Sequence, residues 1–211
     1  KEDTKGTLWI GTYGAGVMAY QQSKDILLSN PIGINTGIVA DILFHNDSLW
    51  IATRSEGLIL FDTKNRTQRH YDDQKVGCND VRSLVREQSG NIWFATPRGI
   101  GSISPLTHEV KMYTTQDGVQ SGEFYERSAV ATPDGYLVFA GFGGVNVFHP
   151  RLVTKNDKCP PVVFTKLQIF NDIIYPSDDR KTKGVLSENI STAKEMIVNY
   201  KQSVFTLEFA G

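Results

Sequence analysis

The sequence has 211 residues, of which 40% are hydrophobic, and a formal net charge of -1. That apolar content is enough for a packed core, and the near-neutral charge gives no electrostatic footprint for nucleic acid or for an anionic membrane surface. No apolar run approaches the ~20 residues of a membrane-spanning helix, and no signal-peptide pattern is found at Lys1.

One phrase recurs along the chain. Its copies are GTLWIGTYGAGVMAY (6–20), DSLWIATRSEGLILF (47–61), GNIWFATPRGIGSIS (90–104) and the degenerate DGYLVFAGFGGVNVF (134–148). The equivalent residues Trp9, Trp50 and Trp93 are separated by 41 and 43 residues. A period near 40–45 residues is typical of β-propeller blades or of helical pairs. The glycines within each copy exclude helical pairs, because each would cost ~1 kcal/mol inside a helix.

Each repeat unit predicts four strands, which in the third unit cover 81–86, 92–96, 100–104 and 110–114. The second strand is apolar at consecutive positions, so it should be covered on both faces, as in a stack of blades. The units cover 36–72, 79–115 and 122–150, with part of another at 4–28. We therefore predict an all-β fold, with three to four four-stranded blades of a β-propeller in residues 1–158.

Such a partial ring would leave two sheet faces exposed to water. We therefore expect the chain to be a piece of a longer protein, or to shield its open ends by forming a homodimer.

The segment 159–211 predicts a second domain that begins at the boundary Pro160-Pro161. Strands are expected at 162–170, 195–200 and 203–209, with a charged, solvated loop at 178–183. Because ~50 residues fall short of the ~100 that an immunoglobulin-like sandwich takes, we expect only the first strands of such a β-sandwich.

At this point the chain resembles a known family. LWIGTYGAGVMAY, LWIATRSEGLILF and IWFATPRGIGSIS resemble the two-component-regulator propeller repeat. GGVNVFHP, followed by PPVVFTKLQIFND and YKQSVFTLEFAG, resembles the junction between that propeller and a triple-tyrosine (Y_Y_Y) sandwich. This order is typical of hybrid two-component sensors of gut Bacteroides. The resemblance implies a periplasmic sensor region, with a membrane helix, a histidine kinase and a response regulator further along, and an oligosaccharide as the usual signal.

The residues predict no catalytic, cofactor or metal site. The four histidines have no metal-ligand spacing, no Gly-x-Ser-x-Gly elbow is present, and nothing marks a pair of carboxylates for general acid–base work. Cys78 and Cys159 are 81 residues apart. We interpret them as two unpaired thiols; a disulfide would need an oxidising compartment and bridging distance.

A ligand site is predicted by topology. In a propeller, the turn between the second and third strands lies on the same rim as the connection between blades. The rim candidates in the turns are Tyr13, Arg54, Glu56, Arg98 and Phe142, and those in the connections are Asn79, Asp80, Phe124 and Tyr125, next to Glu123 and Arg127. Polar groups of these kinds match sugar hydroxyls, and aromatic rings stack on the apolar faces of pyranoses.

Arg54 and Arg98, at equivalent turns, could pair with a carboxylate or sulfate of an acidic oligosaccharide. They should then face one solvent-filled depression. A neutral glycan would shift the expectation to Tyr13, Phe124, Tyr125 and Phe142, and the alternative is that all of these are ordinary exposed loop residues.

Three functions follow from the sequence. The first is a non-catalytic sensor fragment that controls transcription of glycan-utilisation genes through a kinase outside this chain. The second is a propeller enzyme, similar to polysaccharide lyases or hydrolases, and the third is an interaction scaffold without a small ligand.

Overall fold

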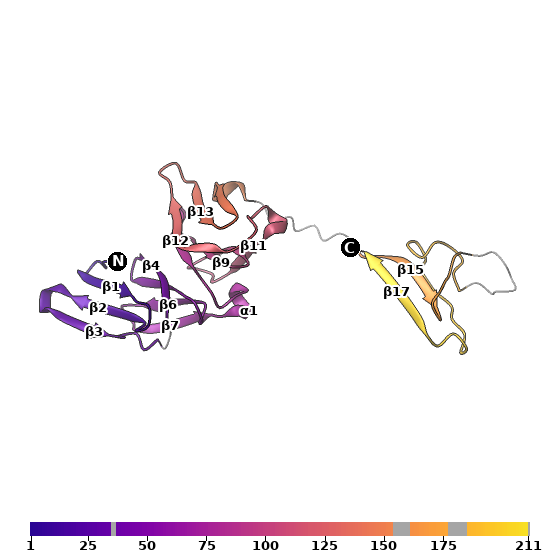
Figure 1. Cartoon of the computed structure of the whole chain (residues 1–211), viewed down its shortest axis with the longest axis horizontal. Coiled ribbons are helices and arrows are strands. Elements are labelled where there is room, and N and C mark those ends of the chain that lie inside the picture. Colours follow the sequence, from indigo (N-terminus) through magenta and orange to yellow (C-terminus); the bar gives the residue numbers. More distant parts are fainter. Residues whose placement is uncertain (35–36, 154–160, 177–184, 211) are drawn as a thin grey trace. The chain divides into compact units, whose positions relative to one another are not determined.

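The computed structural model describes residues 1–34, 37–153, 161–176 and 185–210. The chain divides into two compact units, Lys1–Val153 and Thr154–Gly211, where the sequence predicted a boundary after residue 158. Among the described residues no helix is long and apolar enough to cross a membrane. Figure 1 shows the strands of each unit.

The first unit contains four consecutive antiparallel sheets in its described residues. In each sheet the strands are neighbours in chain order, as in a propeller blade. Sheet one contains β1 (Thr7–Gly11), β2 (Val17–Gln21) and β3 (Ile26–Ser29). Sheet two contains β4 (Val39–His45), β5 (Ser48–Thr53), β6 (Leu58–Asp62) and β7 (Thr67–Tyr71). Sheet three contains β8 (Ser83–Arg86), β9 (Ile92–Thr96), β10 (Gly99–Ile103) and β11 (Val110–Tyr113). Sheet four contains β12 (Phe124–Ala131), β13 (Leu137–Gly141) and β14 (Gly144–Phe148).

The all-β, propeller-type fold that the repeats predict is confirmed. The two inner sheets have four strands and the two outer sheets have three in the described residues. The strands of sheet three match the predicted ranges to within two residues at each end. Short helical turns connect the strands: η1 (Gln22–Lys24), α1 (Asp73–Val76), η2 (Thr115–Asp117) and η3 (Pro150–Leu152).

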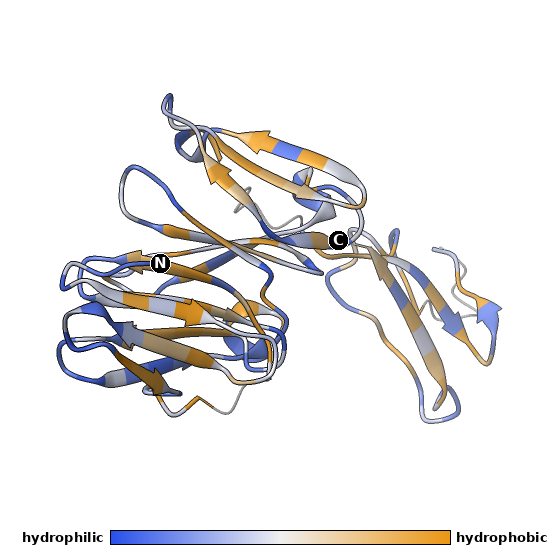
Figure 2. Ribbon diagram, turned by 60° about the vertical axis from the view of Figure 1, so that its left-hand side comes forward, coloured by the Kyte–Doolittle hydropathy of each residue, from blue (hydrophilic) through white to orange (hydrophobic). Residues whose placement is uncertain are grey.

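The core of the first unit lies between adjacent sheets. Trp9 and Trp50 are the third residues of β1 and β5, and Trp93 is the second residue of β9, which begins one residue later in its repeat. The three side chains are 8%, 0% and 4% exposed. Each belongs to a different hydrophobic cluster, one for each interface between neighbouring sheets. Figure 2 shows hydrophobic residues along the strands and hydrophilic ones mainly in the connecting turns. The repeated tryptophan therefore fills the space between blades, as the repeat predicts.

The second unit is a three-stranded antiparallel sheet with the order β16-β15-β17. It contains β15 (Val163–Ile169), β16 (Asp172–Ile173) and β17 (Phe205–Ala210). β15 and β17 occupy two of the three predicted strands. β16 follows a two-residue hairpin turn in which Phe170 and Asn171 have φ angles of 50° and 73°, as a type I′ turn requires.

The predicted strand at 195–200 is wrong, because the structure has no strand there. β15 pairs with β17 along Val163–Ile169 and with β16 at Gln168 and Ile169, and residues 195–200 pair with none of these strands. Met196 packs against the small core around Leu167, while Ile197 stays 64% exposed. The apolar residues of 195–200 therefore suggested a strand that the segment does not form. The predicted charged loop at 178–183 and Cys159 lie outside the described residues.

Candidate functional site

The rim turns are built by one repeated hydrogen-bond motif. Thr12 follows β1, and Thr53 and Thr96 end β5 and β9. Their hydroxyls donate to the carbonyl oxygens of Gly16, Gly57 and Gly99. The same hydroxyl oxygens accept backbone N–H groups of Ala15, Glu56 and Arg98. Each threonine thus closes its own turn from both sides. The motif holds the residues that follow it, including Tyr13 and Arg54, at the rim.

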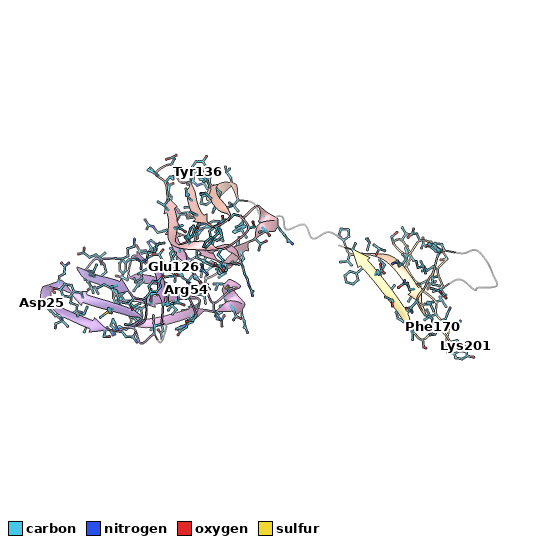
Figure 3. All side chains as sticks on the ribbon, viewed as in Figure 1. Asp25, Arg54, Glu126, Tyr136, Phe170 and Lys201 are labelled. Atoms are coloured by element: carbon cyan, nitrogen blue, oxygen red, sulfur yellow. The ribbon has the colours of Figure 1, made fainter. Side chains whose placement is uncertain are left out.

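Arg54 joins two carboxylates that come from different blades. Its Nε lies 3.0 Å from Asp80 Oδ1, and its Nη1 lies 2.8 Å from Glu126 Oε1. The Tyr13 hydroxyl donates to the other oxygen of Glu126. Figure 3 shows Arg54 beside Glu126. One guanidinium therefore connects the turn after β5 to the strand β12 and to the segment before β8. Glu126 extends this connection to Tyr13, which follows β1.

Arg82 extends the same network inward. It is 7% exposed, and its Nε and Nη2 lie 3.0 and 2.8 Å from Asp80 Oδ1 and Oδ2. Nη2 also lies 2.9 Å from Glu123 Oε2. The hydrogen bond to Asp80, followed by the charges of Asp80 and Glu123, raises the pKa of Arg82 above its ordinary value despite burial. Arg82 is therefore a permanent cation, and Asp80 is shared between two guanidinium groups.

We call this set the rim cluster: Tyr13, Arg54, Asp80, Arg82, Glu123 and Glu126. With ionised carboxylates it holds two positive and three negative charges. The cluster therefore has a negative balance, and the positive charge of Arg54 is already matched by acids of the chain itself.

One exposed aromatic ring lies on β12, next in sequence to the rim cluster, and a second lies on the turn between β13 and β14. Tyr125 and Phe142 are 48% and 69% exposed, and their ring centroids are 4.5 Å apart. Tyr125 lies next in sequence to Phe124, whose carbonyl oxygen accepts a hydrogen bond from Arg82 Nη1. The paired rings therefore form an exposed apolar platform that begins one residue from the rim cluster.

The prediction that Phe124 belongs to the ligand site is wrong. It is fully buried and packs edge-on against Phe139, with ring centroids 6.2 Å apart. Its ring belongs to the core between sheets three and four and cannot contact a ligand at the rim. β12 alternates between core and surface at its start, and this places Tyr125 rather than Phe124 outside.

Three other predicted residues have structural partners away from the rim cluster. Arg98 Nη1 donates to the carbonyl oxygen of Gly77, 2.8 Å away, and among the described residues no contact joins it to Arg54. Asn79 accepts the backbone N–H of Asp73 through its side-chain Oδ1, and the backbone N–H of Gly57 through its own carbonyl oxygen. Glu56 Oε2 lies 4.0 Å from His70 Nδ1. The structure thus gathers Tyr13, Arg54 and Asp80 and leaves these three apart.

Arg82 and Glu126 were missed by the sequence analysis. Arg82 directly precedes β8, where it was counted as a strand residue. Glu126 lies in β12, whose pairing with β13 shifts register between Phe124 and Ala129, with Arg127 at a φ of 54°. Simple alternation cannot predict which face a residue takes in such an irregular strand. The charged residues gathered at 123–127 were the feature of the sequence that could have pointed to Glu126.

A cavity of about 480 Å³ lies beside the inner strands of the first unit. It is lined by Trp9, Asp41, Leu84 and Arg127, among others. Asp41 accepts the backbone N–H of Leu84 at 2.9 Å and that of Ile42 at 2.8 Å. Burial raises the pKa of Asp41 above its ordinary value, in opposition to these hydrogen bonds. Asp41 thereby connects β4 with β8. No group of three or more His, Cys, Asp or Glu side chains able to hold a metal occurs among the described residues.

Comparisons with known proteins agree with this architecture. No family model matches the chain. A curated relative, histidine kinase P4 of Formosa agariphila, is 24% identical over 99% of this chain, which corresponds to 16% of its own length. The chain thus spans about a sixth of that relative's length.

Solved structures with the same fold include extracellular domains of two component systems. The extracellular domain assigned to the hybrid two component system BT3049 of B. thetaiotaomicron matches with a TM-score of 0.72 and 23% identity, over 99% of this chain and 28% of that one. The extracellular domain assigned to the system BT4673 of the same organism matches with a TM-score of 0.61 and 16% identity, over 100% of this chain and 40% of that one. An inactive virginiamycin B lyase from Staphylococcus aureus matches 72% of this chain and 55% of its own with a TM-score of 0.52 and 15% identity.

Proposed function

We propose that the chain is part of a periplasmic sensor region in a hybrid two-component system, and that its signal is an oligosaccharide. The observation that carries this proposal is the match of 99% of the chain, both units included, to an extracellular domain of such a system. In this proposal the second unit begins a triple-tyrosine sandwich. A membrane helix, the kinase and the control of glycan-utilisation genes belong to the rest of the protein.

The rim cluster favours a neutral oligosaccharide over an acidic one. Arg54 is engaged by Asp80 and Glu126, so an incoming carboxylate or sulfate would have to displace an acid of the chain. Such an acid would also meet the negative balance of the cluster. Sugar hydroxyls, in contrast, can donate to the carboxylates, and the Glu123 side chain is 53% exposed for this purpose.

The paired rings of Tyr125 and Phe142 provide the apolar part of the proposed site. Their exposure and their 4.5 Å separation create a surface on which the apolar face of a pyranose can stack. Carboxylates beside exposed aromatic rings are the combination that a neutral sugar requires. In this proposal the platform binds the ring of one sugar unit, while the rim cluster accepts hydroxyls of the same or the next unit.

Tyr125→Ala and Phe142→Ala in the full-length sensor should each weaken binding of a neutral oligosaccharide about tenfold, because each removes half of the platform. Calorimetric titration with a panel of neutral and acidic oligosaccharides measures this effect. Arg98→Ala is the matched control, since it lies at the turn equivalent to that of Arg54 but outside the cluster. Unchanged binding in both aromatic variants would show that the oligosaccharide does not bind at the rim.

The sensor class is tested separately, with the full-length protein in lipid vesicles. The binding oligosaccharide should change the rate of autophosphorylation, while chromatography should recover it intact. Depolymerised sugar without a change in phosphorylation would establish the propeller enzyme instead. A protein partner recovered in place of any sugar would support the scaffold.

A further inference from the structure

A second cavity lies between sheets three and four, at the end of β9 opposite to the rim. It is bounded by the turn Glu87–Asn91, which precedes β9, whereas the rim turn follows β9. The five residues of β9 separate the two ends by ~16 Å, at ~3.3 Å per residue. Its volume is about 230 Å³. This equals about eight waters at ~30 Å³ each, and one monosaccharide unit fits that space.

The buried acid in the wall of this cavity is already occupied. Glu87 is 7% exposed; its Oε2 accepts Trp93 Nε1 at 2.7 Å, and its Oε1 accepts Asn91 Nδ2 at 2.7 Å and the Ser89 hydroxyl. These bonds use both oxygens and fix the turn in place. Glu87 therefore acts as a support for the wall and has little capacity left for a ligand.

The remaining polar groups of the wall include both acceptors and donors. Gln88, Ser89 and Asn91 already donate to other groups, which leaves their side-chain oxygens to accept from the hydroxyls of a ligand. Lys111 and Arg151 bring two positive charges. Lys111 Nζ is 3.6 Å from Glu109 in a pair that is more than half exposed, so this pairing is weak. His149 Nδ1 accepts the backbone N–H of Arg151 at 3.2 Å, so the neutral ring carries its proton on Nε2 and can donate there. Tyr136, labelled in Figure 3, packs edge-on against the His149 ring with centroids 5.4 Å apart.

An apolar compartment adjoins the polar one. Tyr113 and Val153 line both this cavity and a neighbouring one of about 170 Å³. The Tyr113 ring stacks on Trp93, with centroids 5.5 Å apart and an angle of 17° between the planes. The lining of the polar cavity thus offers a ligand one aromatic side chain, Tyr113, and two cationic side chains. This combination is suited to a hydroxylated ring that carries an anion.

We propose that this cavity binds an anionic monosaccharide unit, a hexuronate, whose carboxylate pairs with Lys111 and Arg151. The site goes beyond the function proposed above, because it lies at the other end of β9 and takes a sugar of different charge. Its ligand would also act on the end of the first unit. Pro150, Arg151 and Val153 form one wall, and the first unit ends at Val153. A bound hexuronate therefore connects sheet three to the segment through which the chain leaves the propeller.

The test uses sodium D-glucuronate as the probe and the full chain as the protein, with D-glucose and inorganic sulfate as comparison ligands. Calorimetry should show saturable binding of glucuronate and at least tenfold weaker binding of glucose and of sulfate. Arg151→Gln and Lys111→Gln should each weaken glucuronate binding about tenfold, the loss expected for one charge-assisted hydrogen bond. Lys64→Gln, on the exposed turn between β6 and β7, is the matched control and should bind like the parent chain.

Hydrogen exchange gives a second measurement, which a nonspecific effect of charge on affinity would not change. The amides of Arg151, Leu152 and Val153 donate to His149 Nδ1, His149 O and Pro150 O. Glucuronate should slow their exchange, and Tyr125→Ala should leave this slowing unchanged, which separates this site from the rim. The proposal is overturned if glucuronate does not bind, if glucose or sulfate binds equally well, if both variants bind like the parent chain, or if these amides exchange at the same rate with and without glucuronate.

Discussion

The three repeat tryptophans differ in the hydrogen bond of the indole N–H. Trp9 Nε1 donates to Asp3 Oδ2 at 3.0 Å, and Trp93 Nε1 donates to Glu87 Oε2 at 2.7 Å, each acid standing six residues earlier. Trp50 Nε1 is buried without a hydrogen-bond partner among the described residues. The equivalent earlier position is Phe44, which packs against the core. The repeat therefore requires the volume of the tryptophan ring, and its hydrogen bond is secondary.

Asp41 gives the clearest pH dependence at the scale of one residue. Burial raises its pKa above the ordinary 3.8 in the folded chain. Its contribution to stability is therefore fully present below the unfolded pKa and is lost as the pH rises through the folded pKa. Asp41→Asn should abolish this loss, so that the variant loses less stability than the parent chain as the pH rises above the ordinary pKa of 3.8 and through the raised one. Urea midpoints at each pH measure the difference.

Asp62→Asn is the control with the opposite sign. Hydrogen bonds from the Asn65 backbone and side chain lower the pKa of Asp62, so its contribution is present above the unfolded pKa and is lost as the pH falls through the folded one. A pH profile of Asp41→Asn parallel to that of the parent chain would show that the pKa of Asp41 is not raised by folding.

At the scale of the element, the rim turns depend on glycines that touch the outermost strand. A Cβ on Gly57 would lie 2.2 Å from the carbonyl oxygen of Tyr71, and one on Gly99 would lie 2.1 Å from that of Tyr113. Both glycines have positive φ angles, +74° and +148°. The atoms that would clash belong to the backbone of β7 and β11, so they cannot rotate away as a side chain could.

Gly99→Ala should therefore destabilise the chain by more than about 2 kcal/mol, because strained backbone and a backbone clash act together. Thermal and urea unfolding measure the loss. Gly37→Ala is the matched control, since no heavy atom lies within 4 Å of its added Cβ. Equal stability of the two variants would contradict the role assigned to the turn.

At the scale of the whole molecule, sheet four presents an apolar face to solvent. Val130 pairs with Val138, and Val138 pairs with Val147, so the three side chains form one row across β12, β13 and β14. Val130 and Val147 are 56% and 60% exposed, and Val145, on the same side of β14 as Val147, is 59% exposed. The opposite face, with Leu137 and Phe139, packs against sheet three.

An exposed row of this kind predicts self-association of the chain. Sedimentation velocity over a range of concentrations should detect a dimer, and the double variant Val145→Lys/Val147→Lys should sediment as a monomer. Leu106→Lys is the control, because Leu106 is 91% exposed on the turn between β10 and β11. A parent chain that remains monomeric at every concentration would contradict the prediction.

The sequence by itself determined the repeat, most strand bounds, the buried tryptophans and the turn residues around Gly57 and Gly99. These features are local, because each copy carries its own alternation of strands and turns, and the first three copies each carry their own threonine and glycine at the turn. They also recur, so each copy supports the interpretation of the others. In the second unit, where no repeat supports the assignment, the strand predicted at 195–200 was wrong.

Only the tertiary structure decided which rim residues meet. Arg54 and Glu126 are 72 residues apart, and their 2.8 Å contact depends on how successive sheets stack and on the irregular pairing of β12. That irregularity also determined that Phe124 points into the core and Tyr125 to the surface. Arg54 and Arg98 lie in equivalent turns of the repeat, yet among the described residues only Arg54 is paired with acids of neighbouring blades. Contacts between blades depend on neighbours that a local pattern does not contain, so residues in equivalent turns acquire different partners.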